Sequence, residues 1–272
     1  MLPIIGFSSL GCPDATLEQA LDLAEKFGLA TIELRALGGS LDLPAYLQTT
    51  YGTPQLLADR LRGCSVHIVA LDTSLRIIGG AKNARDECLR LVPWAEALGV
   101  QRLRVFDGGK SLDRSELTEA KATLAWWQQL RRDRGWRVDL MVETHDSLLT
   151  AAAVQRLLEE APGTDILWDT HHTWKRGKED PVVTWGAIAP HVCHIHVKDS
   201  VSRPSANGSF TYVLPGEGEF PMASLMIALR EGEFAGPVCL EWKKLWHPYL
   251  GELEQALAAA NERAWWNPLA PA

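Results

Sequence analysis

Short apolar runs recur along the chain, and each is five to eight residues long. Runs of this length that are rich in Val, Ile and Leu are typical of strands covered on both faces in a parallel sheet. Most of them end in a polar or charged residue. We therefore predict eight strands, at residues 4–9, 31–35, 64–71, 102–107, 137–144, 165–170, 192–198 and 237–242.

Between these runs, apolar residues recur at the spacing of an α-helix. The first such stretch, residues 16–28, begins with Thr16 as a candidate N-cap and ends at Gly28. A second stretch contains Pro93, which is expected to kink the helix or to start a new turn. The predicted helices after the first one cover residues 84–99, 115–135, 148–160, 182–190, 222–232 and 251–266, and residues 42–62 predict two short helical pieces.

Eight strands that alternate with helices over 272 residues predict an α/β protein, a single (β/α)8 TIM barrel. We expect residues 1–272 to form one domain, because no linker or low-complexity segment interrupts the pattern. A doubly wound open sheet is the main alternative. The stretch IGFSSLGCPD after the first run lacks the GxGxxG phosphate loop of that fold, which favours the barrel.

The composition narrows the class of partner. The net charge is −7 and the pI is about 5.6, which does not favour a nucleic-acid-binding protein. The basic residues at 131–134 end a predicted helix, where the helix dipole favours positive charge. The N-terminus lacks the features of a signal peptide, no apolar run approaches the ~20 residues of a membrane span, and the five cysteines form no CxxC pair. We expect a cytoplasmic protein with no membrane partner.

Titratable residues lie where the last four predicted strands end. Catalytic groups of a barrel lie at the carboxyl ends of its strands, and strand side chains alternate between lumen and helix layer. Burial under apolar helices would be costly for these charges, so we expect them in the lumen. Three carboxylates and one imidazole, from Glu143, Asp169, His196 and Glu241, predict a site for one divalent cation, with Mn²⁺, Mg²⁺, Co²⁺ or Zn²⁺ as candidates. Glu33, Arg35 and Arg104 on earlier strands are expected to form a buried ion-pair network.

Six fragments in this order carry a family resemblance: TIELR (31–35), VETHD (142–146), WDTHH (168–172), HIHVKD (194–199), PGEGEFP (215–221) and GPVCLEW (236–242). With these fragments the chain resembles the xylose-isomerase-like TIM barrels, the superfamily of sugar phosphate isomerases and epimerases, over nearly its whole length. The resemblance implies Glu143, Asp169, His196 and Glu241 as metal ligands, with Mn²⁺ favoured. It also implies that His172 and His67 contact substrate. The arginine that binds the sugar in ketose epimerases has its nearest counterpart in Arg203, because position 202 is a serine.

The resemblance implies a mechanism as well. A sugar, sugar phosphate or related polyol with an α-hydroxycarbonyl group would react through a cis-enediolate, with Glu143 and Glu241 as the acid/base pair. If the substrate carries a phosphate, the backbone N–H groups of residues 215–221, with Lys198 and Arg203, are candidates to bind it. A dehydratase or lyase shares the enolate chemistry and is the main alternative. An apurinic endonuclease and a non-catalytic barrel are less favoured, and a homo-oligomer is compatible with the family.

Tryptophans flank the proposed ligands. Trp168 and Trp242 adjoin ligands on their strands, so the alternation of side chains turns them toward the helices as core residues. Trp174 and Trp246 follow strands in loops, where they would stack on a sugar or close the site.

Overall fold

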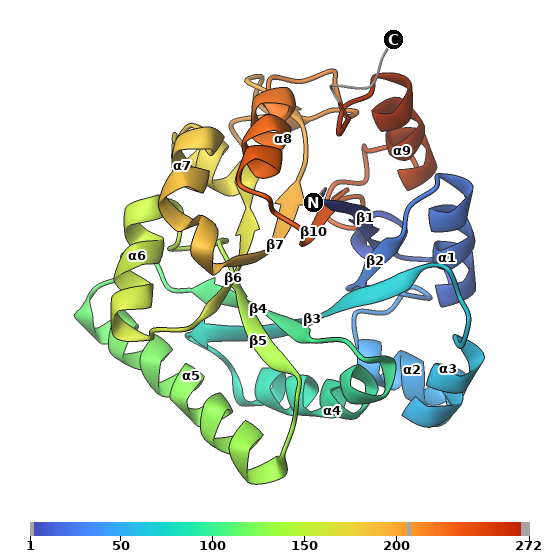
Figure 1. Cartoon of the computed structure of the whole chain (residues 1–272), viewed down its shortest axis with the longest axis vertical. Coiled ribbons are helices and arrows are strands. Elements are labelled where there is room, and N and C mark those ends of the chain that lie inside the picture. Colours follow the sequence, from blue (N-terminus) through green and yellow to red (C-terminus); the bar gives the residue numbers. More distant parts are fainter. Residues whose placement is uncertain (1–2, 206–207, 268–272) are drawn as a thin grey trace.

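The computed structural model describes residues 3–205 and 208–267, and it has the predicted (β/α)8 barrel architecture. Eight parallel strands close in the order β1-β10-β7-β6-β5-β4-β3-β2 (Figure 1). The strands are β1 (Ile4–Ser8), β2 (Thr31–Leu34), β3 (His67–Ile78), β4 (Arg102–Gly108), β5 (Asp139–Glu143), β6 (Asp165–Asp169), β7 (Val192–Val197) and β10 (Pro237–Leu240). All eight coincide with predicted strands, so the prediction of the fold class is confirmed.

Helices surround the strands on the outside of the barrel (Figure 1). They are α1 (Leu17–Lys26), α2 (Leu43–Tyr51), α3 (Pro54–Arg60), α4 (Lys82–Leu98), α5 (Arg114–Arg134), α6 (Ala151–Glu160), α7 (Pro181–Ile188), α8 (Met222–Glu231) and α9 (Leu253–Glu262). Thr16 caps α1 as predicted, with its hydroxyl accepting the Gln19 N–H. The assignment of residues 1–272 to one domain stays a prediction.

The expectation of a new turn at Pro93 is wrong, because α4 continues through it to Leu98. Proline inside a helix costs about 3 kcal/mol. Leu91, Val92 and Trp94, which surround it, are buried against the barrel, and their burial offsets that cost.

The strand β3 extends well beyond the predicted end at residue 71. Leu75, Ile77 and Ile78 are buried and continue the strand after a polar interruption at Asp72 and Thr73. The register with β4 shifts between Asp72 and Arg76, which accommodates the extra length. The polar pair therefore lies inside the strand, although it resembles a turn in the sequence.

Two small elements shape the connections after β6 and β7. A π-helical turn, His172–Arg176, follows β6, and π-helical turns are frequent at functional sites. A short antiparallel hairpin of β8 (Ser200–Val201) and β9 (Thr211–Tyr212) follows β7. Neither element is expected from the sequence.

Part of the barrel lumen is apolar, and there Ala70, Met141 and Leu167 pack together. Outside the strands, Trp168 stacks on Trp185, their ring centroids being 6.1 Å apart. Both Trp168 and Trp242 are buried, so their predicted place in the core is confirmed.

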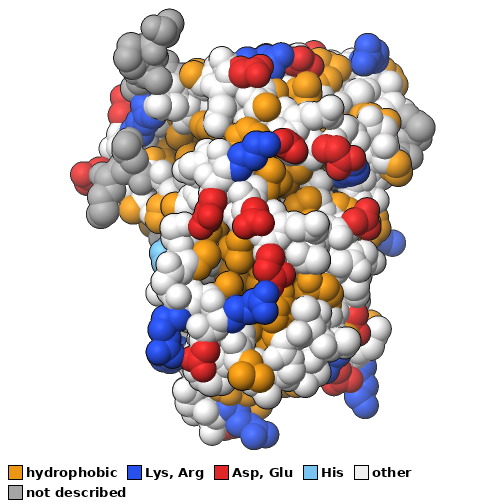
Figure 2. All heavy atoms as spheres, turned by 90° about the vertical axis from the view of Figure 1, so that its right-hand side faces the viewer, with side chains coloured by type: hydrophobic (Ala, Val, Ile, Leu, Met, Phe, Trp, Pro, Cys, Tyr) orange, Lys and Arg blue, Asp and Glu red, His pale blue; other side chains and the backbone are white. Residues whose placement is uncertain are grey.

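Acidic and basic side chains are interspersed on the face of the molecule shown in Figure 2, which lies on the right of Figure 1. The ion pairs Lys26–Glu254 and Arg60–Glu18 join α1 to α9 and α3 to α1 on that side. Among the described residues, none of the helices has the length and apolar character that crossing a membrane requires.

Candidate functional site

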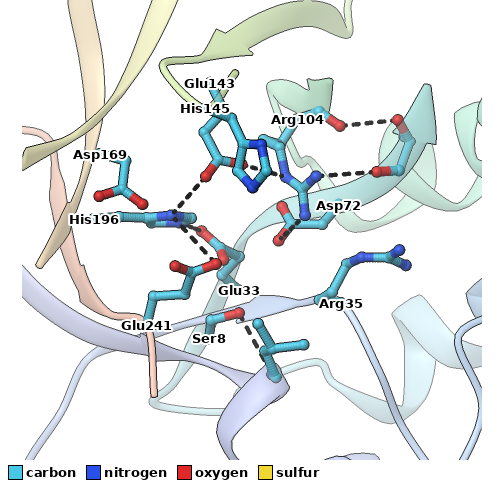
Figure 3. Close-up of polar contacts among 12 residues, drawn as sticks. Ser8, Glu33, Arg35, Asp72, Arg104, Glu143, His145, Asp169, His196 and Glu241 are labelled. Carbon is cyan, nitrogen blue, oxygen red and sulfur yellow. Dashed lines mark hydrogen bonds and ion pairs between the residues drawn. The ribbon is translucent and has the colours of Figure 1, made fainter. Parts of the chain in front are cut away.

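The four predicted ligands converge at the carboxyl ends of the last four strands. Glu143 ends β5, Asp169 ends β6, His196 lies near the end of β7, and Glu241 directly follows β10. One donor atom of each lies within 4.8 Å of the others. The register explains this convergence, because Asp169 is paired with His196 across β6 and β7 and the side chains on this parity face the lumen. Figure 3 shows the cluster.

The cluster offers possible metal-ligand atoms that form no hydrogen bond with the described residues. Both carboxylate oxygens of Glu143 and Nδ1 of His196 are buried and have no hydrogen-bond partner among the described residues. His196 Nδ1 lies 3.8 Å from Glu143 Oε1 and 3.9 Å from Glu241 Oε1. Buried polar atoms without partners are costly and rare. Oxygen and imidazole donors in this arrangement fit a divalent cation.

Lys198 contacts two of the four residues, Asp169 and Glu241. Its ammonium group donates to Asp169 Oδ2 and to Glu241 Oε2, and the side chain is fully buried. Burial lowers the pKa of Lys198, but the two carboxylates outweigh it and hold the pKa above its usual value. Of the remaining oxygens, Asp169 Oδ1 accepts the backbone N–H of His172, and Glu241 Oε1 faces His196.

On the opposite side of the cluster, Arg104 forms a second charged contact. Its Nε lies 3.3 Å from Glu143 Oε2, and its Nη2 donates to Asp72 Oδ2 over 3.2 Å. The guanidinium also lies over the ring of Phe106, at 3.9 Å from the centroid. The expected buried network is confirmed for Arg104. Arg35 differs, because it donates to Leu41 O and Ser74 Oγ.

These cations determine the charge state of the carboxylates. Burial raises the pKa of Glu143, but Arg104 and then His196 outweigh it, so that the pKa lies well below its usual value. Burial also raises the pKa of Glu241, but Lys198 and Lys243 lower it to about 2. Both glutamates are therefore ionised at neutral pH. Burial raises the pKa of Asp169 above its usual value, with Lys198 opposing.

The π-helical turn after β6 directs His172 to the cluster. Its backbone N–H donates to Asp169 Oδ1 over 3.0 Å, and its Nδ1 lies 3.0 Å from the carbonyl oxygen of Thr144. One donor atom each of His172, Glu143 and His145 lie within 4.8 Å of one another. The structure thus places His172 beside the four residues, and its contact with substrate stays a prediction. His171 bonds Ser200 Oγ through Nε2 and packs between Trp174 and Tyr212.

His145 was not predicted as a site residue. Its Nδ1 lies 2.9 Å from Asp146 Oδ1, and its ring packs edge-on against His172, at 4.9 Å between centroids. About a quarter of its side chain is exposed, so it lies at the mouth of the site. The sequence could have identified His145, because it lies two residues after Glu143 and alternation along a strand puts the two side chains on the same side.

Asp107, at the end of β4, holds the loop that carries His145. Its carboxylate accepts the backbone N–H groups of Asp146, Ser147 and Leu148, all within 2.7 Å. The sequence shows that an aspartate lies near a strand end. It does not show which residues that aspartate binds, because they lie about forty residues further along the chain.

The structure does not bring His67 or Arg203 to the cluster. His67 begins β3 and is exposed at the amino end of the barrel, close to Ile4 and Pro237, because β3 runs on for eleven more residues to Ile78. The expected strand, residues 64–71, put His67 near its middle. Arg203 is exposed in the connection after β8, where its carbonyl accepts the Thr211 hydroxyl.

The backbone of residues 215–221 is already bound by a carboxylate. Asp199 accepts the N–H groups of Gly216 and Gly218 at 2.9 Å and of Phe220 at 3.1 Å. A Cβ atom on Gly218 would lie 2.0 Å from Asp199 Oδ1, so the position requires glycine. These amides are therefore not available for the phosphate that the sequence suggested.

The two loop tryptophans differ in position. Trp174 packs against Phe220, with ring centroids 5.4 Å apart, and also against His171. Trp246 follows β10 and is half exposed. Of the two, Trp246 is the one with a free face.

Comparisons with known proteins agree with the barrel fold. Residues 21–269 match the family model described as "Xylose isomerase-like TIM barrel". No curated protein matches the chain.

Among solved structures, the probable 3-DHS dehydratase AsbF of Bacillus anthracis is 20% identical, with a TM-score of 0.77 and coverage of 97% of this chain and 98% of that one. The IOLI protein with a bound zinc atom is 17% identical, with a TM-score of 0.71 and 96% of each chain covered. An L-ribulose 3-epimerase is 18% identical, with a TM-score of 0.68 and coverage of 98% and 95%. At these identities the structures show a shared fold.

Proposed function

The chain belongs to the xylose isomerase-like TIM barrel family, and from that premise we propose that it is a divalent-metal-dependent isomerase or epimerase. Its substrate is a sugar, sugar phosphate or related polyol with an α-hydroxycarbonyl group, which reacts through a cis-enediolate. Glu143 and Glu241 are the acid/base pair. The neighbours include an epimerase and a dehydratase, which fits carbon-acid chemistry of this kind.

One observation carries the proposal. Two ionised carboxylates, Glu143 and Glu241, lie on either side of His196 Nδ1, at 3.8 and 3.9 Å, in a buried site at the carboxyl ends of the strands. A base on one face of a substrate carbon and an acid on the other are what inversion of a C–H centre requires.

Glu143, Asp169, His196 and Glu241 are the residues that would hold the cation, and Mn²⁺ is the ion we favour for three carboxylates and one imidazole. When bound, such an ion polarises a substrate carbonyl and acidifies the adjacent C–H. The pairing of Glu143 with Arg104 through Oε2 leaves Oε1 of Glu143 closest to His196, on the side where the cation would be held.

Glu241 is oriented in a comparable way. Lys198 holds Oε2 of Glu241, so that Oε1 faces His196 from the other side. Because Lys198 and Arg104 keep both glutamates ionised, either one can accept the proton from the substrate carbon. The glutamate that took the proton can return it to the neighbouring carbon, which is isomerisation. Inversion at one carbon requires the opposite glutamate first to take up a proton from solvent and then to deliver it. Substrate then contacts His172, whose Nδ1 is held by the Thr144 carbonyl and whose Nε2 is directed away from it.

Composition supports a small-molecule substrate over a nucleic acid, because the net charge is −7. The five cysteines are free thiols in the structure, which fits the reducing cytoplasm. We extend the proposal to a cytoplasmic enzyme of carbohydrate metabolism.

The test is solvent exchange in deuterated water with a panel of ketoses and the Mn²⁺-loaded protein. We expect deuterium at the carbon next to the carbonyl, and loss of this exchange in Glu143→Gln and in Glu241→Gln. Glu160→Gln, a change at an exposed carboxylate on α6 that pairs with Lys121, is the control and should exchange like the wild type. Absence of exchange on every sugar would overturn the isomerase proposal.

A dehydratase is the second candidate, and His145 is the observation that favours it. Its Nδ1 is held by Asp146, and it lies partly exposed beside Glu143 at the mouth. A protonated imidazole there could donate its proton to a departing β-hydroxyl group. Loss of water from a polyol-derived ketone, followed as an absorbing enone, separates this activity from epimerisation.

A further inference from the structure

The carboxylate of Glu33 makes a contact with His196 that the proposed mechanism does not use. We propose that Glu33 is a positioning residue. It accepts the Nε2–H of His196 and thereby fixes Nδ1 as the nitrogen that binds the cation. This inference rests on the proposed function, since it concerns the same cation site.

The contact reaches across the barrel lumen. Glu33 lies on β2 and His196 on β7, and β1 and β10 separate these two strands in the sheet. Glu33 Oε2 lies 2.8 Å from His196 Nε2, and both side chains are fully buried. His194 Nε2 lies 2.9 Å from the same oxygen. In Figure 3 the carboxylate of Glu33 lies on one side of the imidazole and Glu143 on the other.

The two nitrogens of His196 therefore have different surroundings. Nε2 faces a carboxylate at hydrogen-bond distance, whereas Nδ1 faces Glu143 and Glu241 at 3.8 and 3.9 Å. Nδ1 is buried and has no hydrogen-bond partner among the residues that the structure describes. An imidazole that binds a cation is neutral and carries one proton, and a carboxylate acceptor places that proton on Nε2. The lone pair of Nδ1 then points into the four-residue cluster.

This arrangement has a known physical effect in metal sites. A carboxylate that accepts the second N–H of a metal-bound imidazole fixes the tautomer and ring orientation and makes the ligand more basic. Loss of such a partner lowers metal affinity 10- to 100-fold as a rule. Glu33 can have this effect without contacting the cation, because it binds Nε2 of His196 while the cation would bind Nδ1 on the other side of the ring.

The group of Glu33, His194 and His196 is itself a possible metal cluster by composition. The distances favour hydrogen bonds instead. Glu33 Oε2 lies at hydrogen-bond distance, 2.8 Å, from His196 Nε2 and only 2.9 Å from His194 Nε2, and N···O distances this short leave no room for an ion between the atoms.

The first measurement is binding of Zn²⁺ and of Mn²⁺ to metal-free protein by calorimetry. We expect Glu33→Leu, which removes the acceptor, to lose affinity by about 10- to 100-fold. Glu33→Gln keeps an amide oxygen that can accept the Nε2–H, so its loss should be smaller. Glu87→Gln is the matched control. Glu87 is a buried carboxylate that accepts the Ser74 N–H outside the cluster, and its change should leave the affinity unaltered.

The second measurement does not require a variant that folds. In ¹⁵N-histidine NMR of the Zn²⁺-loaded wild type, we expect a proton on Nε2 of His196 and the metal on Nδ1. Metal on Nε2, or a Glu33→Leu protein that folds and binds as tightly as the wild type, overturns the inference and leaves the proposed function intact. A wild-type protein that binds neither ion overturns both.

Discussion

The guanidinium of Arg104 lies against the carboxylate of Glu143, with Nε 3.3 Å from Oε2 in a fully buried site. The same guanidinium bonds Asp72. Removing one partner of a buried charged pair leaves the other uncompensated, which costs about 3–5 kcal/mol. We expect Arg104→Met to lower the free energy of unfolding by about that amount in urea denaturation.

A double variant tests this explanation. Arg104→Met combined with Asp72→Asn removes one of the two uncompensated carboxylates and should recover part of the loss. If Arg104→Met costs less than about 1 kcal/mol, the pair contributes no more than an exposed one.

Divalent cations should stabilise the protein if the four-residue cluster binds them. Addition of Mn²⁺ at about 100 times its dissociation constant to EDTA-treated protein should raise the free energy of unfolding by about 2.7 kcal/mol. Glu143→Gln should respond less at the same Mn²⁺ concentration, because it removes one charged ligand. Glu160→Gln should respond like the wild type. If the melting temperature of the wild type does not change when Mn²⁺ is added, the prediction is contradicted.

Gly218 is fixed by its contact with Asp199. A methyl group there would meet the carboxylate at 2.0 Å and separate it from the loop N–H groups. We expect Gly218→Ala to destabilise the protein by about 1–3 kcal/mol, measured by thermal and urea unfolding. Gly186, inside α7, has open space around the added atom, so Gly186→Ala should be neutral or stabilising by up to about 1 kcal/mol. Equal effects of the two changes would contradict the structure.

Glu96 gives a pH-dependent prediction far from the site. Burial raises the pKa of Glu96, but the backbone N–H of Val138 and the contacts with Arg137 outweigh it and lower the pKa below its usual 4.5. The unfolded chain therefore binds the proton first, and the stabilisation is fully present above pH 4.5. It is lost as the pH falls through the lowered pKa.

The variant Glu96→Gln should accordingly be less stable than the wild type at pH 7, and the two unfolding curves should converge as the pH is lowered. A difference that grows toward acid pH would have the wrong sign.

Strand-end chemistry was predictable because side chains alternate along a strand. That rule placed Glu143, Asp169 and His196 in the lumen, and the structure has them there. The resemblance implied a substrate contact for His67, but the structure places it at the amino end of the barrel, because the strand expected to end at residue 71, before the polar pair Asp72-Thr73, continues to Ile78. A strand boundary that is several residues wrong moves a side chain from one mouth of the barrel to the other.

Contacts between distant segments could not be predicted in the same way. Nothing in the local sequence of TIELR says that Glu33 meets His196 across the lumen, or that Lys198 binds Asp169 and Glu241. Such contacts depend on the closure of the barrel and on which residues share a layer. The sequence shows which residues carry charge, whereas the closure of the sheet determines which of these residues contact one another.

Asp107 lies near the end of β4 and Asp199 lies two residues after β7, and each holds a loop by its backbone N–H groups. Backbone amides are common to all residues except proline, so the anchors constrain the path of the chain more than the identity of the side chains that the loop displays. The side chains on the rim of this barrel can therefore be substituted, and the loops can lengthen beyond the anchored segments, while the strands that carry the four-residue cluster keep their positions. The two aspartates thus fix the course of the backbone in these loops and leave the side chains on the loops less constrained.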